Sequence, residues 1–226
     1  MSLPGFRILV FAKAPRVGRS KTRLCPPCTP LQAAILAEAM LTDTLRAVAA
    51  TPAARRVLVL EGSPGPWLPA GFEVLLQRGE GQAARLAAGF EDAGGPALLI
   101  GMDTPQVTPA LLVQATAQLS APGVDAVLGI AADGGWWALG LRRPDPSALE
   151  GVPMGSPRTG DCQRRRLHEL GLAVAELPML QDVDEIADAF EVAAAIPGSA
   201  FETALSALPA PSWTGALLEM RGVRTP

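Results

Sequence analysis

Five cationic side chains fall within eleven residues near the start of the chain: Lys13, Arg16, Arg19, Lys21 and Arg23. Gly18 lies among them and allows the backbone to turn tightly. Such a group suits a polyphosphate, whose charge needs several cations together with backbone N–H donors. The segment lacks the GxxxxGK[ST] pattern, so it is not a Walker A loop. Both lysines of the chain lie in this segment, which is predicted to bind phosphate. The alternative is that it is a basic loop exposed to solvent with no ligand.

Acidic side chains follow two apolar runs further along the chain. Asp103 comes directly after residues 97–101, where it is placed to hold a divalent cation that bridges phosphate groups. Its alternative role is to cap a turn before Pro105. Asp182 and Asp184 share one side of an extended segment, and they offer either a further metal ligand or a helix N-cap.

The sequence Asp-Gly-Gly-Trp-Trp at Asp133–Trp137 joins two further apolar runs. Gly134 and Gly135 let a ligand approach the backbone closely. Neighbouring side chains of a strand point to opposite faces, so one of Trp136 and Trp137 is expected in the core and the other at a cleft. The alternative is a hairpin turn of the Asp-Gly type, to which a functional role is then added.

Strands and helices alternate along the chain. Short apolar runs predict strands at 6–12, 56–61, 72–77, 97–101, 125–131, 136–141 and 172–177. Helical spacing of apolar residues predicts helices at 30–51, with Thr29 as N-cap, and at 82–93, 108–119, 157–170 and 184–195. This pattern predicts an α/β fold of three layers, α/β/α, with a mainly parallel sheet. Ligands bind at the carboxyl ends of such strands, which is where the charged clusters fall.

Length and composition bound the domain organisation and the partners. The 226 residues are expected to form one domain over 1–226, with a core over 6–195. The tail 197–226, including Trp213–Met220, is expected to pack on the core or on the second copy of a homodimer. A net charge of -3 argues against a nucleic-acid partner. No apolar run reaches about 18 residues, so no membrane span is expected.

The remaining composition narrows the chemistry and the location. One histidine disfavours a Ser-His-Asp triad and sites with several histidine ligands. Three cysteines are an odd number, and Cys25-x-x-Cys28 lacks enough partners for a zinc site. The apolar stretch Ile8–Ala12 is too short for a signal peptide, and its charges follow it instead of preceding it. We therefore expect a cytoplasmic protein.

Taken in order, these clusters resemble the sequence blocks of the bacterial DUF2064 family, uncharacterised or glycosyltransferase-related proteins with a GT-A-like fold of nucleotide-diphospho-sugar transferases. The blocks are F-x-K-x-P-x-x-G-x-x-K-T-R-L at 11–24, G-x-D-x-P at 101–105, D-G-G-[YW]-[YW]-x-x-G-L at 133–141 and D-V-D-x-x-x-D at 182–188. A middle stretch, 77–86, is also similar, with Arg85 in the arginine position. The resemblance spans roughly 6–195. Met102 and the segment Val152–Gly155 depart from the family pattern.

The resemblance implies roles for individual residues. The nucleotide phosphates would be bound by Lys13, Arg16, Gly18, Lys21, Arg23 and Arg85. Mg²⁺ or Mn²⁺ would bind Asp103, with Asp184 as its partner acid. The acceptor or sugar side would be lined by Asp133, Gly134, Gly135 and Trp136, and Asp133 is the best candidate for a general base.

The implied activity is a metal-dependent transfer from a nucleotide-activated donor to a small-molecule acceptor. Glycosyl transfer from a nucleotide diphospho-sugar is the leading interpretation. The alternative enzyme is a nucleotidyltransferase, in which a phosphorylated acceptor attacks an NTP and pyrophosphate leaves. The third hypothesis is a degenerate family member that binds a nucleotide without catalysis.

Overall fold

A single mixed sheet organises residues 5–209, the part of the chain that the computed structural model describes. Its seven strands are β1 (Arg7–Lys13), β2 (Arg55–Glu61), β3 (Glu73–Leu76), β4 (Ala97–Gly101), β5 (Ala126–Ala131), β6 (Trp136–Leu141) and β7 (Val174–Leu180). Their order across the sheet is β3-β2-β1-β4-β6-β5-β7. β6 runs antiparallel to β4 and β5, and the other neighbouring pairs are parallel. The prediction of a mainly parallel sheet is confirmed.

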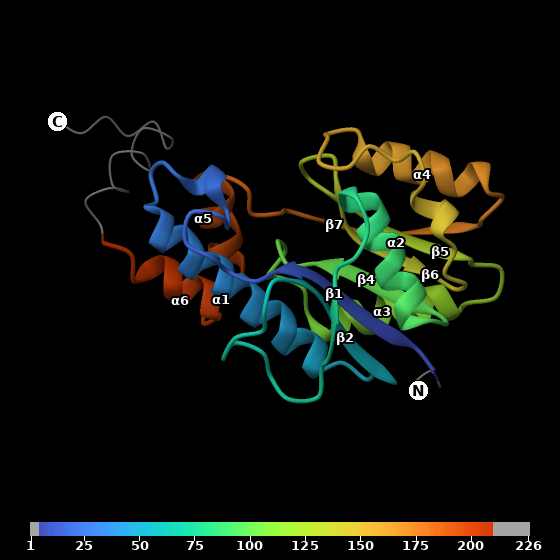
Figure 1. The fold of residues 1–226 in the computed structure, drawn as a ribbon, viewed down its shortest axis with the longest axis horizontal. Helices are drawn as coiled ribbons and strands as arrows, with labels where there is room; N and C mark the ends of the chain where they lie inside the picture. The colour runs from blue at the N-terminus through green and yellow to red at the C-terminus, as the bar shows by residue number, and fades with distance from the viewer. Residues whose placement is uncertain (1–4, 210–226) are drawn as a thin grey trace.

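Helices cover both faces of this sheet. They are α1 (Pro30–Ala49), α2 (Gly81–Ala93), α3 (Pro109–Ser120), α4 (Thr159–Glu169), α5 (Ile186–Ala195) and α6 (Ala200–Ser206), with short 3₁₀ turns η1 (Thr22–Leu24) and η2 (Pro146–Leu149). Figure 1 shows α1, α5 and α6 gathered together, away from α2 and α4. The three-layer α/β/α architecture is therefore the predicted one.

The central strands are buried on both faces, as their continuous apolar runs require. In β1, Ile8 and Val10 belong to the hydrophobic core that includes α1, α3, α5 and α6. Leu9, between them, belongs to the second core with Leu86 and Phe90 of α2. The strand alternation thus divides one apolar run between two helical layers.

Most element ends agree with the sequence, and the differences have local causes. Thr29 caps α1 as predicted, since its hydroxyl accepts from the Gln32 N–H and the Gln32 side chain accepts from the Thr29 N–H. The helix predicted over 184–195 is α5 and begins at Ile186 instead of residue 184, because Glu185 and Asp188 form a capping box there. β7 extends to Leu180 because its pairing with β5 continues past a register shift.

The end of the described chain returns to α1. Asp43 of α1 accepts hydrogen bonds from the backbone N–H groups of Ala200 and Phe201, at the start of α6. Residues 200–206 therefore pack against α1, whereas Trp213–Met220 of the predicted tail lie outside the described residues. Among residues 5–209, no helix combines the length and apolar character needed to cross a membrane.

Candidate active site

Three loops meet at the carboxyl ends of β4, β5 and β7, where backbone hydrogen bonds join them. The Val183 N–H donates to the Asp103 carbonyl over 2.9 Å. The Ala132 N–H donates to the Leu180 carbonyl over 2.9 Å. Because β6 is antiparallel, the turn that follows β5 lies at the same edge as the other two loops. The acids that the sequence places at separate strand ends are thereby brought together.

Asp188 orders the segment that carries Asp182 and Asp184. One of its carboxylate oxygens accepts from the backbone N–H groups of Asp184, at 3.1 Å, and Glu185, at 2.7 Å. The other accepts from the Gln181 side chain at 2.9 Å. These bonds fix the backbone on both sides of Asp184, so the last acid of the 182–188 block positions the site without lining it.

Lys21 lies between two of the acids. Its Nζ is 2.8 Å from Asp103 Oδ1 and 3.0 Å from Asp184 Oδ1, and its side chain is only 10% exposed. Burial alone would lower the pKa of the Lys21 ammonium, but the charges of Asp103 and Asp184 outweigh burial and raise it. Lys21 therefore contacts carboxylates in this structure, where the sequence predicted phosphate contacts.

Asp184 is shared between two cations. Arg23 Nη1 lies 2.7 Å from Asp184 Oδ2, opposite the oxygen that Lys21 contacts. Burial would raise the pKa of the Asp184 carboxyl, but Lys21 and Arg23 outweigh it and lower the pKa. Asp184 is therefore held ionised, as a metal ligand or a partner of basic residues must be.

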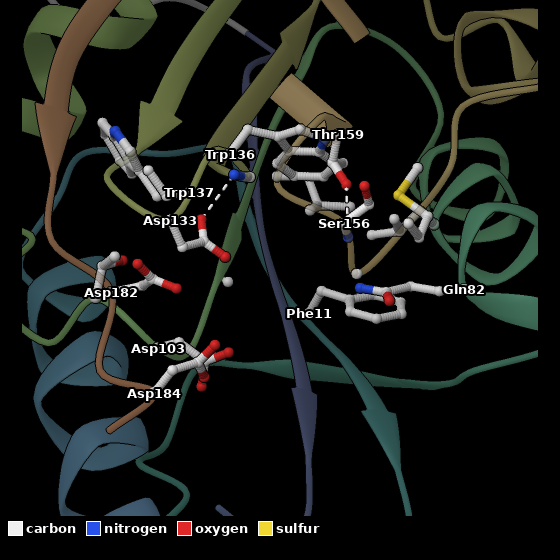
Figure 2. A pocket seen from close by; sticks show the side chains of 18 residues that line it. Phe11, Gln82, Asp103, Asp133, Trp136, Trp137, Ser156, Thr159, Asp182 and Asp184 are labelled. Carbon is white, nitrogen blue, oxygen red and sulfur yellow. Dashed lines mark hydrogen bonds between the residues drawn. The ribbon is translucent and has the colours of Figure 1, made fainter. Parts of the chain in front are cut away.

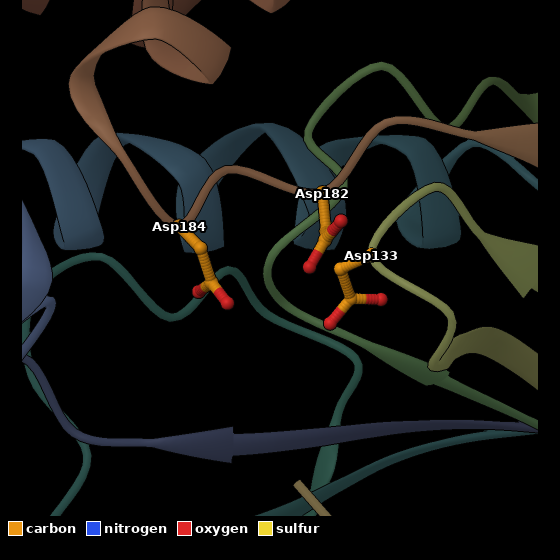
Figure 3. Close-up of side chains that lie close together, drawn as sticks. All are labelled: Asp133, Asp182 and Asp184. Carbon is orange, nitrogen blue, oxygen red and sulfur yellow. The ribbon is translucent and has the colours of Figure 1, made fainter. Parts of the chain in front are cut away.

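Asp184 also belongs to a cluster of three acidic side chains. Asp133, Asp182 and Asp184 each offer a carboxylate oxygen, and these atoms lie within 4.8 Å of one another (Figure 3). The pKa of Asp182 is raised to about 6, first by burial and then by the negative charges of Asp133 and Asp184. The sequence paired Asp184 with Asp103. The structure adds Asp182, which the sequence had left as a further ligand or a helix cap.

The Asp-Gly-Gly segment at 133–135 forms the expected turn and also packs closely against the start of α4. Asp133 Oδ1 accepts from the Gly135 N–H at 2.6 Å, which fixes the carboxylate. Gly134 has φ +87, and a Cβ there would overlap the carbonyl oxygen of Pro157. The Gly160 N–H in turn donates to the Gly134 carbonyl over 2.8 Å. A Cβ on Gly160 would lie 2.7 Å from the Gly135 carbonyl oxygen, so Gly134 and Gly160 both have steric reasons to be glycine. Their close contact holds the start of α4 beside the acids.

Two cavities adjoin the acids. The first, here called the carboxylate cavity, has a volume of about 210 Å³ and is lined by Asp103, Asp133, Asp182, Asp184, Trp136, Ser156 and others (Figure 2). The second, called the basic cavity, has about 280 Å³ and is lined by Lys13, Arg19, Lys21, Arg23 and others. Phe11, Gln82, Asp103 and Asp184 line both cavities. The two spaces therefore meet at Asp103 and Asp184.

The predicted phosphate ligands do not all face the basic cavity. Arg16 and Gly18 instead line a third space of about 380 Å³, together with Lys13 and Arg19. Arg85 contributes to none of these three linings, because its Nη1 lies 2.7 Å from Glu61 Oε2. Glu61 also faces Lys13, at 3.7 Å. Arg85 is thus paired beside the loop.

The strand alternation predicts one tryptophan in the core and one at a cleft, and Trp137 does lie in the core, but both tryptophans line the carboxylate cavity. Trp137 is buried, and its indole N–H donates to the Pro178 carbonyl at 2.9 Å. Trp136 is half-buried and lines the carboxylate cavity. Figure 2 shows Trp136 and Phe11 on opposite sides of the space between the acids and Ser156. Sequence reasoning identified Trp136 through its turn but missed Phe11, which looks like any other residue of a buried strand.

Other residues that sequence reasoning missed come from the segment before α4. Met154, Ser156 and Thr159 line the carboxylate cavity, and they reach it because Gly134 and Gly160 allow close backbone contact. Met154 lies in the segment Val152–Gly155, which departs from the family pattern, and Ser156 and Thr159 carry no such sequence signal. Met102, the other departure, is buried in the hydrophobic core.

The cysteines lie apart from this chemistry. Cys25, Cys28 and Cys162 are free, and Cys28 is buried in the core that contains α1. Burial, followed by the nearby Cys25, raises the pKa of the Cys28 thiol to about 12. A reactive thiol needs a lowered pKa. Cys28 therefore has the character of a structural thiol.

Comparisons with known proteins agree with this architecture. A model of the family described as "Uncharacterized protein conserved in bacteria (DUF2064)" matches residues 34–156. A proposed nucleotide-diphospho-sugar transferase from Desulfovibrio desulfuricans G20 is similar in structure, with a TM-score of 0.80 and 24% identity over 95% of this chain and 97% of that one. No curated protein matches the sequence.

Two more distant structures share the fold. A CMP:2-keto-3-deoxy-manno-octonic acid synthetase complexed with CTP has a TM-score of 0.56 and 13% identity, over 85% of this chain and 98% of that one. Rv0371c from Mycobacterium tuberculosis H37Rv has a TM-score of 0.53 and 22% identity, over 83% and 97%. The fold is thus that of GT-A-like and nucleotidyltransferase proteins.

Proposed function

The chain belongs to the DUF2064 family, and we propose that it is an enzyme that transfers a glycosyl group from a nucleotide diphospho-sugar to a small-molecule acceptor, with the help of a divalent cation. One observation carries the proposal. A cavity lined by cations and a cavity lined by carboxylates and aromatic rings meet at Asp103 and Asp184. A donor and an acceptor bound on either side of these residues would have their reacting groups at the junction.

The basic cavity is the donor side of this proposal. Lys13, Arg19 and Arg23 line it and surround the space with positive charge. Among residues 5–209, no acidic partner lies within ion-pair distance of Arg19, and Lys13 is 3.7 Å from Glu61. Cations without tight partners can bind phosphate oxygens without first breaking a salt bridge. The diphosphate of the donor is therefore assigned to this cavity.

Oxygen donors for a divalent cation are present at the junction. The Lys21 ammonium between Asp103 and Asp184 marks one position where the fold accommodates a cation. One oxygen each of Asp133, Asp182 and Asp184 lies within 4.8 Å of the others at a second position, where the two Asp184 oxygens also contact Lys21 and Arg23. Carboxylate oxygens are the preferred ligands of Mg²⁺ and Mn²⁺. A bound cation would neutralise charge on the leaving diphosphate.

We assign the cation to Asp182 and Asp184 and leave Asp103 as the partner of Lys21. Asp133 is then the residue that accepts the proton of the attacking hydroxyl. One of its oxygens is held by the Gly135 N–H, and the carboxyl lines the acceptor side. A fixed carboxylate beside the nucleophile is the usual arrangement for a general base.

Nucleotidyl transfer is the second candidate, because a synthetase that shares this fold is complexed with CTP. The products separate the two reactions. Glycosyl transfer releases a nucleoside diphosphate from a nucleotide sugar, whereas nucleotidyl transfer releases pyrophosphate from an NTP. UDP-, GDP-, ADP- and CDP-sugars and NTPs are each incubated with Mg²⁺ or Mn²⁺ and a mixture of acceptors. The release of nucleoside diphosphate and of pyrophosphate is then measured.

The proposal expects nucleoside diphosphate release that needs the cation and that falls at least 100-fold in Asp133→Asn. Release of pyrophosphate would instead support nucleotidyl transfer, the second candidate. If only ligand-induced thermal stabilisation is seen, with no turnover, the chain binds nucleotides without catalysis.

A further inference from the structure

The carboxylate cavity carries its own chemical signature. Four of its lining residues are Asp103, Asp133, Asp182 and Asp184, and its lining contains no lysine, arginine or histidine. Lys21 and Arg23, which contact lining acids, line the basic cavity instead and are already paired with Asp184. We propose that the carboxylate cavity binds an uncharged, polyhydroxylated acceptor of about monosaccharide size and excludes acceptors that carry a phosphate or a carboxylate. This inference rests on the proposed function, whose acceptor it defines.

Hydrogen bonding is the first argument. Thr104 is buried and lines the cavity, and its hydroxyl has no partner among the described residues. The Trp136 indole N–H, which also lines the cavity, is likewise buried without a partner there. An ionised carboxylate only accepts hydrogen bonds, and a hydroxyl can donate or accept. The Trp136 indole N–H is a donor only, so the missing partner must offer acceptors as well as donors for the carboxylates of the wall, which the hydroxyl groups of a polyol do and the oxygens of a phosphate dianion do not.

The remaining polar groups of the wall are partly used by the protein. The Thr159 hydroxyl donates to the Pro153 carbonyl at 2.7 Å and accepts from the Ser156 N–H. The Ser156 hydroxyl accepts from the Arg158 N–H at 3.2 Å, which leaves its own proton to donate. Free hydroxyls and carboxylates on opposite sides of one space match a ligand with several hydroxyl groups.

The apolar walls and the size of the cavity limit the ligand further. Trp136 and Phe11 face the space from opposite sides (Figure 2), and Met154 and Leu86 also line it. Such surfaces bury the C–H faces of a ring and leave its hydroxyls for the polar wall. A volume of about 210 Å³ equals about seven water molecules at roughly 30 Å³ each. One sugar-sized unit fits this space.

A bound divalent cation does not reverse this selectivity. In the proposed reaction the donor diphosphate binds that cation, so the positive charge it brings is matched by the charge of the donor. A phosphorylated acceptor would then add charge beside Asp103 and Asp133, with no lysine or arginine of the cavity to meet it. An uncharged polyol avoids that cost.

Saturation-transfer NMR tests the preference without turnover. The probes are two matched pairs, D-glucose with D-glucose 6-phosphate and glycerol with glycerol 3-phosphate. The protein is wild type, with Mg²⁺ and inorganic pyrophosphate present to fill the donor side. At least one neutral probe is expected to bind, and its phosphorylated counterpart is expected to give at least a tenfold weaker signal. Binding of the phosphorylated probes as strongly as the neutral ones, or no binding of either neutral probe, would overturn the inference.

Substitutions of lining residues test which side chains cause the preference for uncharged probes. Asp133→Asn with Asp182→Asn is expected to raise the signal of the phosphorylated probe about tenfold relative to the neutral one. Thr104→Val is expected to weaken neutral-probe binding about fivefold, the size of one hydrogen bond. Asp161→Asn is the matched control, because Asp161 is 84% exposed and pairs with Arg164 away from the cavity, and it should change neither signal. Since wild-type selectivity is the primary result, the inference remains testable if the double variant does not fold.

Failure of the two ideas can be told apart. If no nucleotide sugar is consumed but neutral probes still bind selectively, the proposed function fails and the acceptor preference stands. If nucleotide sugar is consumed only with phosphorylated acceptors, the acceptor inference fails and glycosyl transfer stands.

Discussion

The backbone N–H of Val183 donates a hydrogen bond to the backbone carbonyl of Asp103 over 2.9 Å. This bond joins the loop after β4 to the loop after β7 and sets Asp103 opposite Asp184. The Lys21 ammonium fits between the two carboxylates, 2.8 Å from Asp103 Oδ1 and 3.0 Å from Asp184 Oδ1. The position of the cation is therefore a consequence of main-chain pairing between distant loops.

Lys21→Met is expected to lower the free energy of unfolding by about 2 kcal/mol. Removing one partner of a buried ion pair costs about 3–5 kcal/mol, and 47% exposure of the Asp103 side chain reduces that figure here. Arg23→Met is the matched control with a loss under about 1 kcal/mol, since the Arg23 side chain is 68% exposed. Urea unfolding measures both, and equal losses would contradict the assignment of Lys21 as the buried partner.

A divalent cation should compensate for the missing ammonium. In Lys21→Met the carboxylates of Asp103 and Asp184 are left facing each other, so Mg²⁺ or Mn²⁺ is expected to stabilise this variant more than wild type. Asp103→Asn and Asp182→Asn then locate the ion by calorimetry. A larger loss of Mn²⁺ affinity in Asp182→Asn supports the assignment made above, and a larger loss in Asp103→Asn places the ion where Lys21 now lies.

Gly134→Ala is expected to be much more destabilising than Gly18→Ala. Both glycines have positive φ, +87 and +74, which costs an alanine about 1–2 kcal/mol. A Cβ at Gly18 would meet no atom within 4 Å, whereas at Gly134 it would overlap the Pro157 backbone. We expect losses of about 1 kcal/mol for Gly18→Ala and at least about 3 kcal/mol for Gly134→Ala. Similar urea midpoints for the two variants would show that the start of α4 moves away freely.

The two tryptophans should separate stability from binding. Trp137→Phe loses the hydrogen bond to Pro178 and part of a buried contact, and it is expected to cost about 2 kcal/mol. Trp136→Phe should cost less stability but weaken the binding of neutral polyols to the carboxylate cavity. Urea unfolding and the saturation-transfer measurement together check this pair. A Trp136→Phe variant with unchanged polyol binding would remove Trp136 from the acceptor side.

We expect Cys28 to lower the free energy of unfolding at alkaline pH. Its thiol has a pKa of about 12 in the folded protein against an ordinary value of 9.0, so above pH 9 the unfolded state releases a proton that the folded state keeps. Stability due to the neutral thiol is complete below pH 9 and falls as pH rises towards 12, by up to about 1.4 kcal/mol per pH unit. Unfolding at pH 8 and pH 10 in wild type and Cys28→Ala measures it. Cys162→Ala controls for removal of a buried thiol, and an alkaline loss that persists in Cys28→Ala would exclude Cys28 as its source.

Much of the fold could be predicted because its signals are local. The apolar runs that became β4 and β6 have the predicted bounds, and Thr29 caps α1 through residues only three positions apart. The edge of the sheet that bears the acids was also predictable, because parallel strands end at a common edge. The difference in burial between Trp136 and Trp137 follows from the strand period of two, which points neighbouring side chains to opposite faces of the sheet.

The sequence by itself determined which residue types reach the carboxyl edge of the sheet, and therefore that phosphate, carboxylate and cation chemistry meet there. Only the tertiary structure decided which charges neutralise one another. Lys21 and Asp184 lie 163 positions apart in the chain, and Arg85 turned to Glu61. A hydrogen bond or ion pair depends on side-chain positions to within a fraction of an ångström. Those positions are set by long-range backbone bonds, such as that between Asp103 and Val183, which no local pattern encodes.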